Sequence, residues 1–361
     1  MLVHICCSVD SHFFLEKLQA DYPQEKLTGF FYDPNIHPYS EYRLRYLDVQ
    51  RSCKKLGIDL IEGEYDYENW LEAVQGLENE PEKGKRCEVC FDRRFEVSAN
   101  KALELGETKM TTTLLVSPLK SQEQLKASGD AFHQKYGVEF IAVNYRADGG
   151  TQDQSRVTKQ ERLYRQDYCG CLFGLTIQRE QQKRIMDEMF SPISNSTLPA
   201  SIEERLEMYE KRINLEDEGV SYQIIKEKFL NYRQFTCKLT LGKKEPIPAY
   251  ALCYSTLPRK RAQGRIENSI NNISYLNREE VKFITLKHFN NLADTNYLHV
   301  NELIFNPPSF NDELRIRNTI ISSQFDLSPI VIVETISDKK ITLELNAKVY
   351  EDTKERLITN Y

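Results

Sequence analysis

The first 190 residues alternate between short apolar runs and longer segments of helical pattern, and this alternation is the strongest constraint on the fold. Short β-branched or aromatic runs predict strands, whereas apolar residues at helical spacing predict helices. Strands separated by helices form βαβ units, which give a parallel sheet with helices on both faces. The sequence therefore predicts an α/β domain. The expected strands are LVHIC, LTGFFYD, IDLIEGEY, KMTTTLLVSP and VEFIAVNY, and the expected helices cover 42–56 and 122–136.

The amino-acid composition of the chain changes near residue 190. The segment FSPISNSTLPAS, residues 190–201, is rich in Ser, Pro and Asn, which is typical of a linker. Ser201 and Glu204 then form a capping-box pattern at the start of a helix through 202–215. We expect two domains, 1–190 and 195–361, the second of α+β type, because 361 residues are many for one core. Its expected strands, in a half-solvated antiparallel sheet, are FTCKLTLG, IPAYALCYST, LHVNELIF, SPIVIVETIS and KITLELNAKVY.

Charge and hydropathy narrow the class of protein. The chain has no window of about 18 apolar residues and no basic flank with an apolar core at its start, so we expect a cytoplasmic protein without a membrane span. A net charge of −6 argues against a generally basic, nucleic-acid-binding surface. It leaves room for a local basic groove, because phosphate recognition needs only a few clustered cations.

Nine cysteines are the most unusual feature of the composition. Their number is odd and the expected compartment is reducing, so a disulfide framework is not expected. Three isolated thiols are interpreted as core residues. The other six form three close pairs, and paired thiolates in a dry core repel one another unless a cation is present. The isolated residues are Cys53, Cys237 and Cys253, and the pairs are Cys6 with Cys7, Cys87 with Cys90, and Cys169 with Cys171.

Each cysteine pair stands beside a turn. Cys87 and Cys90 form a CxxC motif, whose turn brings both sulfurs to one side. Gly170 between Cys169 and Cys171 lets the backbone fold tightly enough for both thiols to face one centre. Cys6, Cys7 and Asp10 follow the first expected strand, at the sheet edge where ligands of α/β proteins bind.

Six thiols and a carboxylate exceed what one structural zinc needs. Iron with sulfide is the more natural occupant, because a four-iron cluster takes up to four protein ligands and leaves two thiols for a second metal. Asp10 is expected to replace a cysteine at one iron, which would make that iron chemically active. The sequence thus predicts a [4Fe-4S] cluster and a second metal ion, interpreted as iron.

The polar loop after the second expected strand, FYDPNIHPYSEYRLR, is a candidate substrate-binding loop. Pro34 and Pro38 stiffen it, which lowers the entropy lost when a ligand binds. An ordinary surface loop is the alternative. Earlier in the chain, His4 is interpreted as a core histidine. Candidate proton donors are Tyr32, Asp33, His37 and Tyr164, among which the sequence does not choose.

Basic and aromatic residues are interleaved before the second cysteine pair, a pattern typical of base stacking and phosphate binding. A solvated helix face is the alternative. The residues concerned are Arg156, Lys159, Arg162, Tyr164, Arg165, Gln166 and Tyr168. A second basic run could grip an RNA backbone or form an ordinary charged hairpin. It comprises Arg259, Lys260, Arg261 and Arg265.

With these motifs assembled, the first 180 or so residues resemble the epoxyqueuosine reductase family of the QueH type. The resemblance covers about half of the chain and rests on long motifs that occur in order. They are HICC, GFFYDPNIHPYSEYRLR, DYENWLEAVQGLENEPEKGKRCEVCFDRR, TTTLLVSP and YRQDYCGCLFG. Many relatives carry a further cysteine where this chain has Asp10, although Asp10 as a ligand agrees with some members.

The resemblance implies a cobalamin-independent oxidoreductase with a Rossmann-like (HUP-like) sheet. Such an enzyme removes the epoxide oxygen of epoxyqueuosine at the wobble position of tRNA with a GUN anticodon, giving queuosine. It implies an iron–sulfur cluster, a second metal and an external electron donor. The partition of ligands between the metals stays open. The implied ligands are Cys6, Cys7, Asp10, Cys87, Cys90, Cys169 and Cys171.

Two other functions compete with this one. A tRNA-thiolation enzyme of the adenylating type would need a glycine-rich phosphate loop after the first strand, and CCSVDS lacks those glycines. A zinc-stabilised RNA-binding module would bind zinc without iron or sulfide. The second domain lies outside the family motifs, and we expect it to contact tRNA or to form oligomers.

Overall fold

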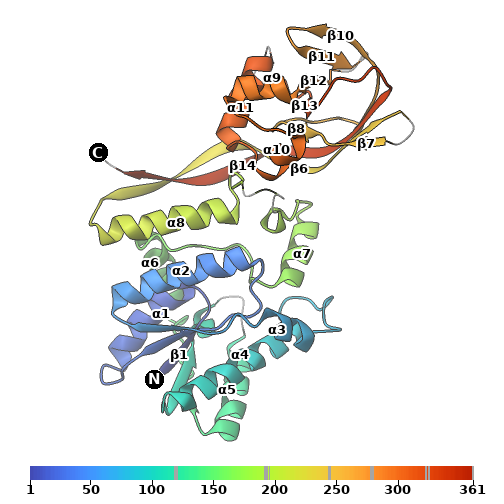
Figure 1. The fold of residues 1–361 in the computed structure, drawn as a ribbon. Coiled ribbons are helices and arrows are strands. Elements are labelled where there is room, and N and C mark those ends of the chain that lie inside the picture. Colours follow the sequence, from blue (N-terminus) through green and yellow to red (C-terminus); the bar gives the residue numbers. More distant parts are fainter. Residues whose placement is uncertain are drawn as a thin grey trace. The chain divides into compact units, whose positions relative to one another are not determined.

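The computed structural model describes residues 1–117, 121–190, 194, 196–242, 245–276, 280–321, 323 and 326–359 (Figure 1). Pro118 and part of the expected linker at 190–201 lie outside the described residues. The chain forms two compact units. The first comprises Met1–Met189 with Leu206–Val220, and the second Phe190–Arg205 with Ser221–Tyr361. No helix among the described residues is long and apolar enough to cross a membrane.

The first unit is built on a parallel five-stranded sheet, which confirms the expected fold class. The strands lie in the order β3-β2-β1-β4-β5, and every neighbouring pair is parallel. The segment predicted as the fifth strand forms only two residues of ladder. The strands are β1 (Leu2–Ile5), β2 (Thr28–Phe31), β3 (Asp59–Glu62), β4 (Lys109–Thr112) and β5 (Glu139–Phe140).

Helices connect these strands, and α1 packs against α2 while α4 packs against α5. Helix α5 ends at Gly137 in the left-handed conformation, φ 72°, as its sequence predicts. The helical elements are α1 (Ser8–Asp21), α2 (Tyr39–Leu56), α3 (Tyr67–Ala73), α4 (Lys85–Glu104), the 3-10 turn η1 (Thr113–Val116), α5 (Gln122–Tyr136), α6 (Gly150–Gln160), α7 (Leu172–Gln181) and η2 (Asp187–Met189).

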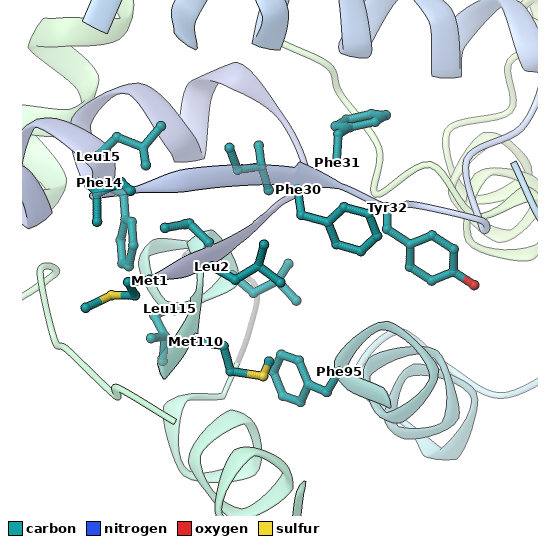
Figure 2. Packing of buried hydrophobic residues seen from close by; sticks show 14 of the residues in the cluster. Met1, Leu2, Phe14, Leu15, Phe30, Phe31, Tyr32, Phe95, Met110 and Leu115 are labelled. Atoms are coloured by element: carbon teal, nitrogen blue, oxygen red, sulfur yellow. The ribbon is translucent and has the colours of Figure 1, made fainter. Parts of the chain in front are cut away.

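Apolar side chains from the strands and the covering helices form the main core of this unit (Figure 2), and a smaller second cluster consists of Trp70, Val74, Cys90 and Cys171. His4 lies inside the main core on β1, completely buried, with its ring bonded to Thr112 Oγ1 at 2.8 Å and to the Tyr32 carbonyl oxygen at 3.0 Å. Burial lowers the pKa of His4 to about 3. The interpretation of His4 as a core histidine is therefore confirmed, as is the burial of Cys53 in the same core.

Strand order decides where a site can lie. The chain runs from β1 outward to β2 and β3, and then crosses to β4 and β5 on the other side of β1. The carboxyl ends of β1 and β4 therefore border the crevice where such sheets bind ligands. Cys6 follows β1 and Thr113 follows β4 at this point.

Among the described residues, the second unit contains two sheets and three complete helices. One sheet is antiparallel, in the order β7-β6-β14-β9, and the other has the order β10-β11-β12-β13-β8 with β12 and β13 parallel. The elements are β6 (Tyr222–Leu241), β7 (Glu245–Ile247), β8 (Tyr250–Ala251), β9 (Arg261–Gly264), β10 (Ile266–Ile270), β11 (Ile273–Leu276), β12 (Lys282–Thr285), α9 (Leu286–Ala293), α10 (Val300–Phe305), α11 (Phe310–Ile320), β13 (Ile330–Val333) and β14 (Ile341–Thr359). The α+β expectation holds, although one strand pair is not antiparallel.

One predicted strand of the second unit is wrong. The segment LHVNELIF contains the helix α10, because Val300 and Leu303, three residues apart, are the side chains that it buries. Glu302 accepts the Leu298 backbone N–H at 2.8 Å and ties the preceding residue to the first turn of the helix. Leu298, which completes the misleading alternation, is 74% exposed.

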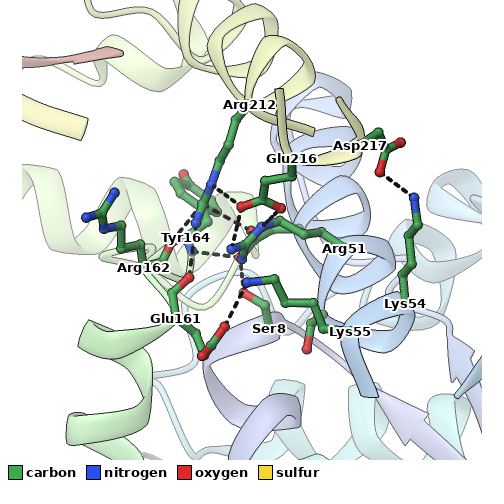
Figure 3. Close-up of polar contacts among 12 residues, drawn as sticks. Ser8, Arg51, Lys54, Lys55, Glu161, Arg162, Tyr164, Arg212, Glu216 and Asp217 are labelled. Carbon is green, nitrogen blue, oxygen red and sulfur yellow. Dashed lines mark hydrogen bonds and ion pairs between the residues drawn. The ribbon is translucent and has the colours of Figure 1, made fainter. Parts of the chain in front are cut away.

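Helix α8 (Ile202–Asp217) begins as predicted, with the Ser201 hydroxyl accepting the Glu204 backbone N–H. Its residues from 206 onward belong to the first unit, although the sequence predicted the whole helix in the second domain. The reason is a buried ionic cluster (Figure 3). Arg212, with no exposed surface, donates to the carbonyl oxygens of Arg162 and Glu161 and lies 3.7 Å from the buried Asp48.

Replacing Arg212 tests this cluster. Arg212→Ala leaves Asp48 buried with one cation fewer, so we expect the free energy of unfolding of the first unit to fall by about 3–5 kcal/mol. Urea denaturation measures the change. The exposed neighbour on the same helix supplies the control, since Lys211→Ala should change stability by less than about 0.5 kcal/mol. Equal effects of the two variants would contradict the role given to Arg212.

Glu313 is a buried carboxyl in the second unit. Burial raises its pKa from 4.5 to about 7, although hydrogen bonds from Tyr250 and the Cys253 backbone N–H act in the opposite direction. The charge of Glu313 contributes to raising the pKa values of four neighbouring side chains. They are Tyr232, Tyr250, Cys253 and Tyr297.

A raised carboxyl pKa makes the folded state hold its proton more tightly than the unfolded chain does. The stabilisation is therefore complete below pH 4.5 and is lost as pH rises through about 7. We expect Glu313→Gln, which cannot ionise, to lose less stability than the wild type over this interval. The difference should be on the order of 3 kcal/mol. Thermal unfolding of both proteins across the pH series measures it, and parallel curves would refute the prediction.

Candidate metal centre

Cys6, Cys7 and Asp10 meet where β1 passes into α1. The Cys6 sulfur lies 3.9 Å from the Cys7 sulfur and 3.7 Å from Asp10 Oδ2. One ligand atom from each of the three residues falls within 4.8 Å of the others. Thr113, at the end of β4, fixes Cys6 from the other side, because its hydroxyl accepts the Cys6 backbone N–H at 3.3 Å and lies 3.6 Å from the sulfur. We name Cys6, Cys7 and Asp10 the strand-end triad.

The triad is electrostatically incomplete without a cation. The hydrogen bond with Cys7 and burial raise the pKa of Cys6, and the charges of Cys7, Asp10 and Asp33 raise it further. Cys7 caps the N-terminus of α1, whose dipole favours anions, but one helix end does not offset three of them. A bound metal cation would stabilise the deprotonated thiols directly.

The other four paired cysteines line one cavity of about 390 Å³. Cys87 and Cys90 come from the first two turns of α4, and Cys169 and Cys171 come from the turn before α7. Only the strand-end triad brings three ligand atoms within 4.8 Å among the described residues, so the four thiols surround a wider space. We name them the cavity thiols. Their arrangement suits a group of several atoms better than one ion.

Electrostatic interactions connect the cavity thiols to one another. Burial raises the pKa of Cys171 to about 11, and the Cys169 and Cys90 thiols contribute in the same direction. The Gly174 backbone N–H and Arg86 oppose this rise. Cys171 also caps the N-terminus of α7. Burial therefore outweighs these positive groups, and a bound metal would favour the deprotonated thiol.

The turn that carries Cys169 and Cys171 is held by its backbone. Gly170 has φ +112°, and a Cβ atom there would come within 2.8 Å of Ile36 Cγ1. Its carbonyl oxygen accepts the His37 backbone N–H at 2.9 Å. The buried Arg45 guanidinium donates to the carbonyl oxygens of Cys169 and Tyr168, at 3.0 and 3.1 Å. The expected role of Gly170 in a tight turn is thus met by its conformation.

Arg94 links the two groups of ligands. It lies one helical turn after Cys90 on α4, is almost fully buried, and contacts Asp33 at 2.9 Å and the Asn35 amide oxygen. Burial acts to lower its pKa, but Asp33 and then the thiols of Cys90, Cys169 and Cys6 raise it above the ordinary value, so its charge acts on both groups. Burial raises the pKa of Asp33 to about 6, even though Arg94 lowers it.

The cavity wall carries buried donors that suit an iron–sulfur group. Asn35 Nδ2, Trp70 Nε1 and Arg94 Nε have no hydrogen-bond partner among the described residues, and all three residues line the cavity. Buried N–H groups without partners are costly, and cluster sulfides accept hydrogen bonds of this kind. The residues present therefore fit the group expected from the sequence.

Of the four candidate proton donors, Asp33 has the clearest connection to the ligands, through Arg94. The Tyr32 hydroxyl instead donates to Asp66 at 3.2 Å, and the buried Tyr164 hydroxyl donates to Glu41 at 2.8 Å. The half-buried His37 ring stacks on Tyr67, with 4.7 Å between the ring centroids.

The expected base-stacking role of the aromatic residues before Cys169 does not agree with the structure. Tyr164 and Tyr168 are 5% and 8% exposed, because both pack inside the unit and bond to the loop at 37–41. Exposed aromatic surface lies instead at the start of α2, where Tyr39 is 52% exposed and contacts the ring of Tyr65.

Sequence reasoning missed three residues of this site. Arg94, Trp70 and Thr113 lie within the quoted motifs, but the sequence assigned none of them a role. Only the spacing of Arg94, four residues after Cys90 in CFDRR, could have placed it on the same helix face.

Comparison with known proteins agrees with the family resemblance that the sequence motifs indicate. A family profile described as epoxyqueuosine reductase QueH matches residues 1–176. The epoxyqueuosine reductase QueH of Helicobacter pylori is 38% identical over 370 aligned residues, covering 98% of both chains. That of Histophilus somni is 39% identical, over 48% of this chain and 72% of its own. That of Thermotoga maritima is 35% identical, over 51% and 95%.

Solved structures are less similar. A predicted subunit of a tRNA methyltransferase from Methanocaldococcus jannaschii is 11% identical over 53% of this chain and 92% of its own, with a TM-score of 0.34. We base nothing further on so slight a likeness.

Two glycines beside the cysteines allow a matched test of the turn. Gly170→Ala should lower the thermal stability, because the new methyl group meets Ile36 and the backbone requires φ +112°. Gly174→Ala should be neutral or raise stability by up to about 1 kcal/mol, because Gly174 lies in α7 and its nearest neighbour is 4.0 Å from the new Cβ. Thermal unfolding distinguishes them. A Gly170→Ala protein as stable as Gly174→Ala would show that the turn tolerates a side chain.

Proposed function

This chain belongs to the epoxyqueuosine reductase QueH family, a family of oxidoreductases, and from that premise we propose that it reduces epoxyqueuosine in tRNA to queuosine. The observation that carries the proposal is the agreement along almost the whole length of a relative with that name. The convergence of thiols beside the crevice of the sheet supports it independently. A reaction on tRNA also agrees with a cytoplasmic location.

In this proposal the two groups of ligands hold different metals. The cavity thiols, Cys87, Cys90, Cys169 and Cys171, hold a [4Fe-4S] cluster, and the strand-end triad holds a second iron ion. When bound, the cluster would supply single electrons and the second iron a Lewis acid for the epoxide oxygen. The width of the cavity and the closeness of the triad support this partition.

The reaction consumes two electrons and two protons. Both C–O bonds of the epoxide break, a carbon–carbon double bond forms, and the oxygen leaves as water. An external reductant supplies the electrons. Asp33 is the proposed proton donor, since it is buried, lies beside Arg94 and has a pKa near 6. Arg94 keeps the Asp33 carboxyl in position and balances charge at both groups of ligands.

Surface charge supports a contact of the second unit with tRNA. Four exposed cations occupy the turn before β9 and the residues up to β10, and none has an ion-pair partner among the described residues. Phosphates would neutralise such a cluster. It consists of Arg259, Lys260, Arg261 and Arg265.

Anaerobic turnover tests the proposed function. Iron-reconstituted protein, dithionite and tRNA bearing epoxyqueuosine should yield a nucleoside that has lost the mass of one oxygen. We expect Cys90→Ser to reduce bound iron and sulfide together, and Cys6→Ser to reduce iron while retaining most sulfide. Both should abolish turnover, because each removes a ligand.

Cys53→Ala provides the control, because Cys53 is a buried cysteine of the core that lines neither group of ligands. It should retain metal and activity. Protein with a full complement of iron and sulfide but no turnover would contradict the substrate. Zinc in place of iron and sulfide would contradict the cofactor and favour the RNA-binding module.

A further inference from the structure

The second unit contains a cavity of about 560 Å³ that none of the proposed chemistry uses. All of the lining residues belong to this unit. They come from β6, β8, α10 and α11, from Phe190, Ser194, Ser196 and Leu198, and from Ala249, Cys253 and Pro307 beside these elements. Its volume lies in the range typical of sites for small organic ligands. Five aromatic residues line it. They are Phe190, Tyr232, Phe235, Tyr250 and Phe310.

Strand β6 is irregular at this cavity. It pairs with β14 over nearly its whole length, and the register shifts once, where Thr236 pairs with Asn346 but Gln234 pairs with Ala347. Phe235 is the extra residue of this bulge and lines the cavity. Bulges re-aim side chains and occur often beside binding sites. The six consecutive residues 232–237 all line the cavity, which regular alternation of a strand would not allow.

Glu313 supplies the main polar group of the wall. It is 6% exposed, and it has no ion-pair partner among the described residues. One carboxylate oxygen accepts the Tyr250 hydroxyl and the other accepts the Cys253 backbone N–H at 2.9 Å. A carboxylate offers about four acceptor positions, so each oxygen retains one. A buried carboxylate without a cation is costly, and a ligand that brings positive N–H groups would offset that cost.

The Arg233 guanidinium, which lines the cavity, donates its hydrogen bonds to protein groups. Arg233 donates to the Asn231 side chain at 2.5 Å, to the Tyr232 carbonyl at 3.0 Å and to the Pro199 carbonyl at 2.8 Å, and it lies over the Phe190 ring. It thereby stiffens one wall. Metal binding is disfavoured, since Glu313, Cys237 and Cys253 do not bring three ligand atoms together among the described residues.

We propose that this cavity binds a planar ligand with an amidine-type edge, whose two parallel N–H groups bond to Glu313 and whose ring lies among the aromatic side chains. Two parallel donors match the two remaining acceptor positions of the carboxylate. Aromatic faces favour both flat rings and cations. The class includes benzamidine-like cations and the neutral Watson–Crick edge of guanine. This inference does not depend on the reductase function.

Calorimetric titration of the full-length chain with benzamidine is the direct test. We expect binding to the wild type, and binding weaker by about tenfold or more to Glu313→Gln, which keeps the shape of the side chain but loses its charge. Glu280→Gln, at an exposed site of the same unit, is the matched control and should bind like the wild type. Guanosine is titrated in parallel, and its binding would extend the class to neutral edges.

Two further measurements keep the result specific. Thr236→Trp should obstruct the cavity and abolish binding, because Thr236 lines it. Benzamidine remains protonated near neutrality, so wild-type affinity should rise from below to above pH 7, where Glu313 ionises, and the rise should be absent in Glu313→Gln. The raised pKa values of Tyr232, Tyr250, Cys237 and Cys253 keep those groups neutral over this range.

Three results would overturn the proposal. They are no binding of benzamidine by the wild type, equal affinity of the wild type and Glu313→Gln, and undiminished binding by a folded Thr236→Trp protein. Thermal unfolding of each variant confirms that it is folded before titration. A failure here leaves the reductase function unaffected, since turnover is measured on other residues in another unit.

Discussion

Like-charge repulsion among seven potential ligands is the constraint on which the first unit depends. Six thiols and one carboxylate gather in two groups beside the crevice of the parallel sheet, and as anions they repel one another. Positive charge beside these groups comes from the N-termini of α1 and α7 and from the buried cation Arg94. These groups reduce the repulsion, and metal ions would remove most of what is left.

The positions of these ligands are set by the course of the backbone and by hydrogen bonds to it, not by contacts of the cysteine side chains. β1 brings Cys6 to the sheet edge, and the next residue, Cys7, opens α1, so the triad lies at one strand-to-helix junction. Arg45 binds the turn at 168–169 and Gly170 allows its tight course. The second group therefore depends on contacts between segments that are more than 120 residues apart in the chain.

The second unit contains a different kind of buried group, a carboxyl group that lines a cavity. Glu313 is buried with no ion-pair partner among the described residues, in the wall of a cavity that the bulge in β6 also lines. Native proteins seldom retain a buried, uncompensated carboxylate without a use for it. In the first unit Arg212 compensates the buried charge of Asp48, whereas Glu313 has acceptor positions left for a ligand.

Sequence alone determined the class of the first unit, because alternating apolar runs and helical segments admit few arrangements other than a parallel sheet. It also indicated that each cysteine pair presents its thiols together and that Gly170 allows a tight turn between Cys169 and Cys171, since these are consequences of local spacing. It did not determine that residues 298–305 contain a helix, because alternation over so few residues fits both structures and the buried contacts of Val300 and Leu303 decided the outcome. Tertiary structure alone brought Arg94 between the two groups of ligands, buried Tyr164 and Tyr168, and joined α8 to the first unit through Arg212. The physical reason is common to these cases, because the free energy of a buried charge or ring depends on partners that are distant in the chain and that no local pattern specifies.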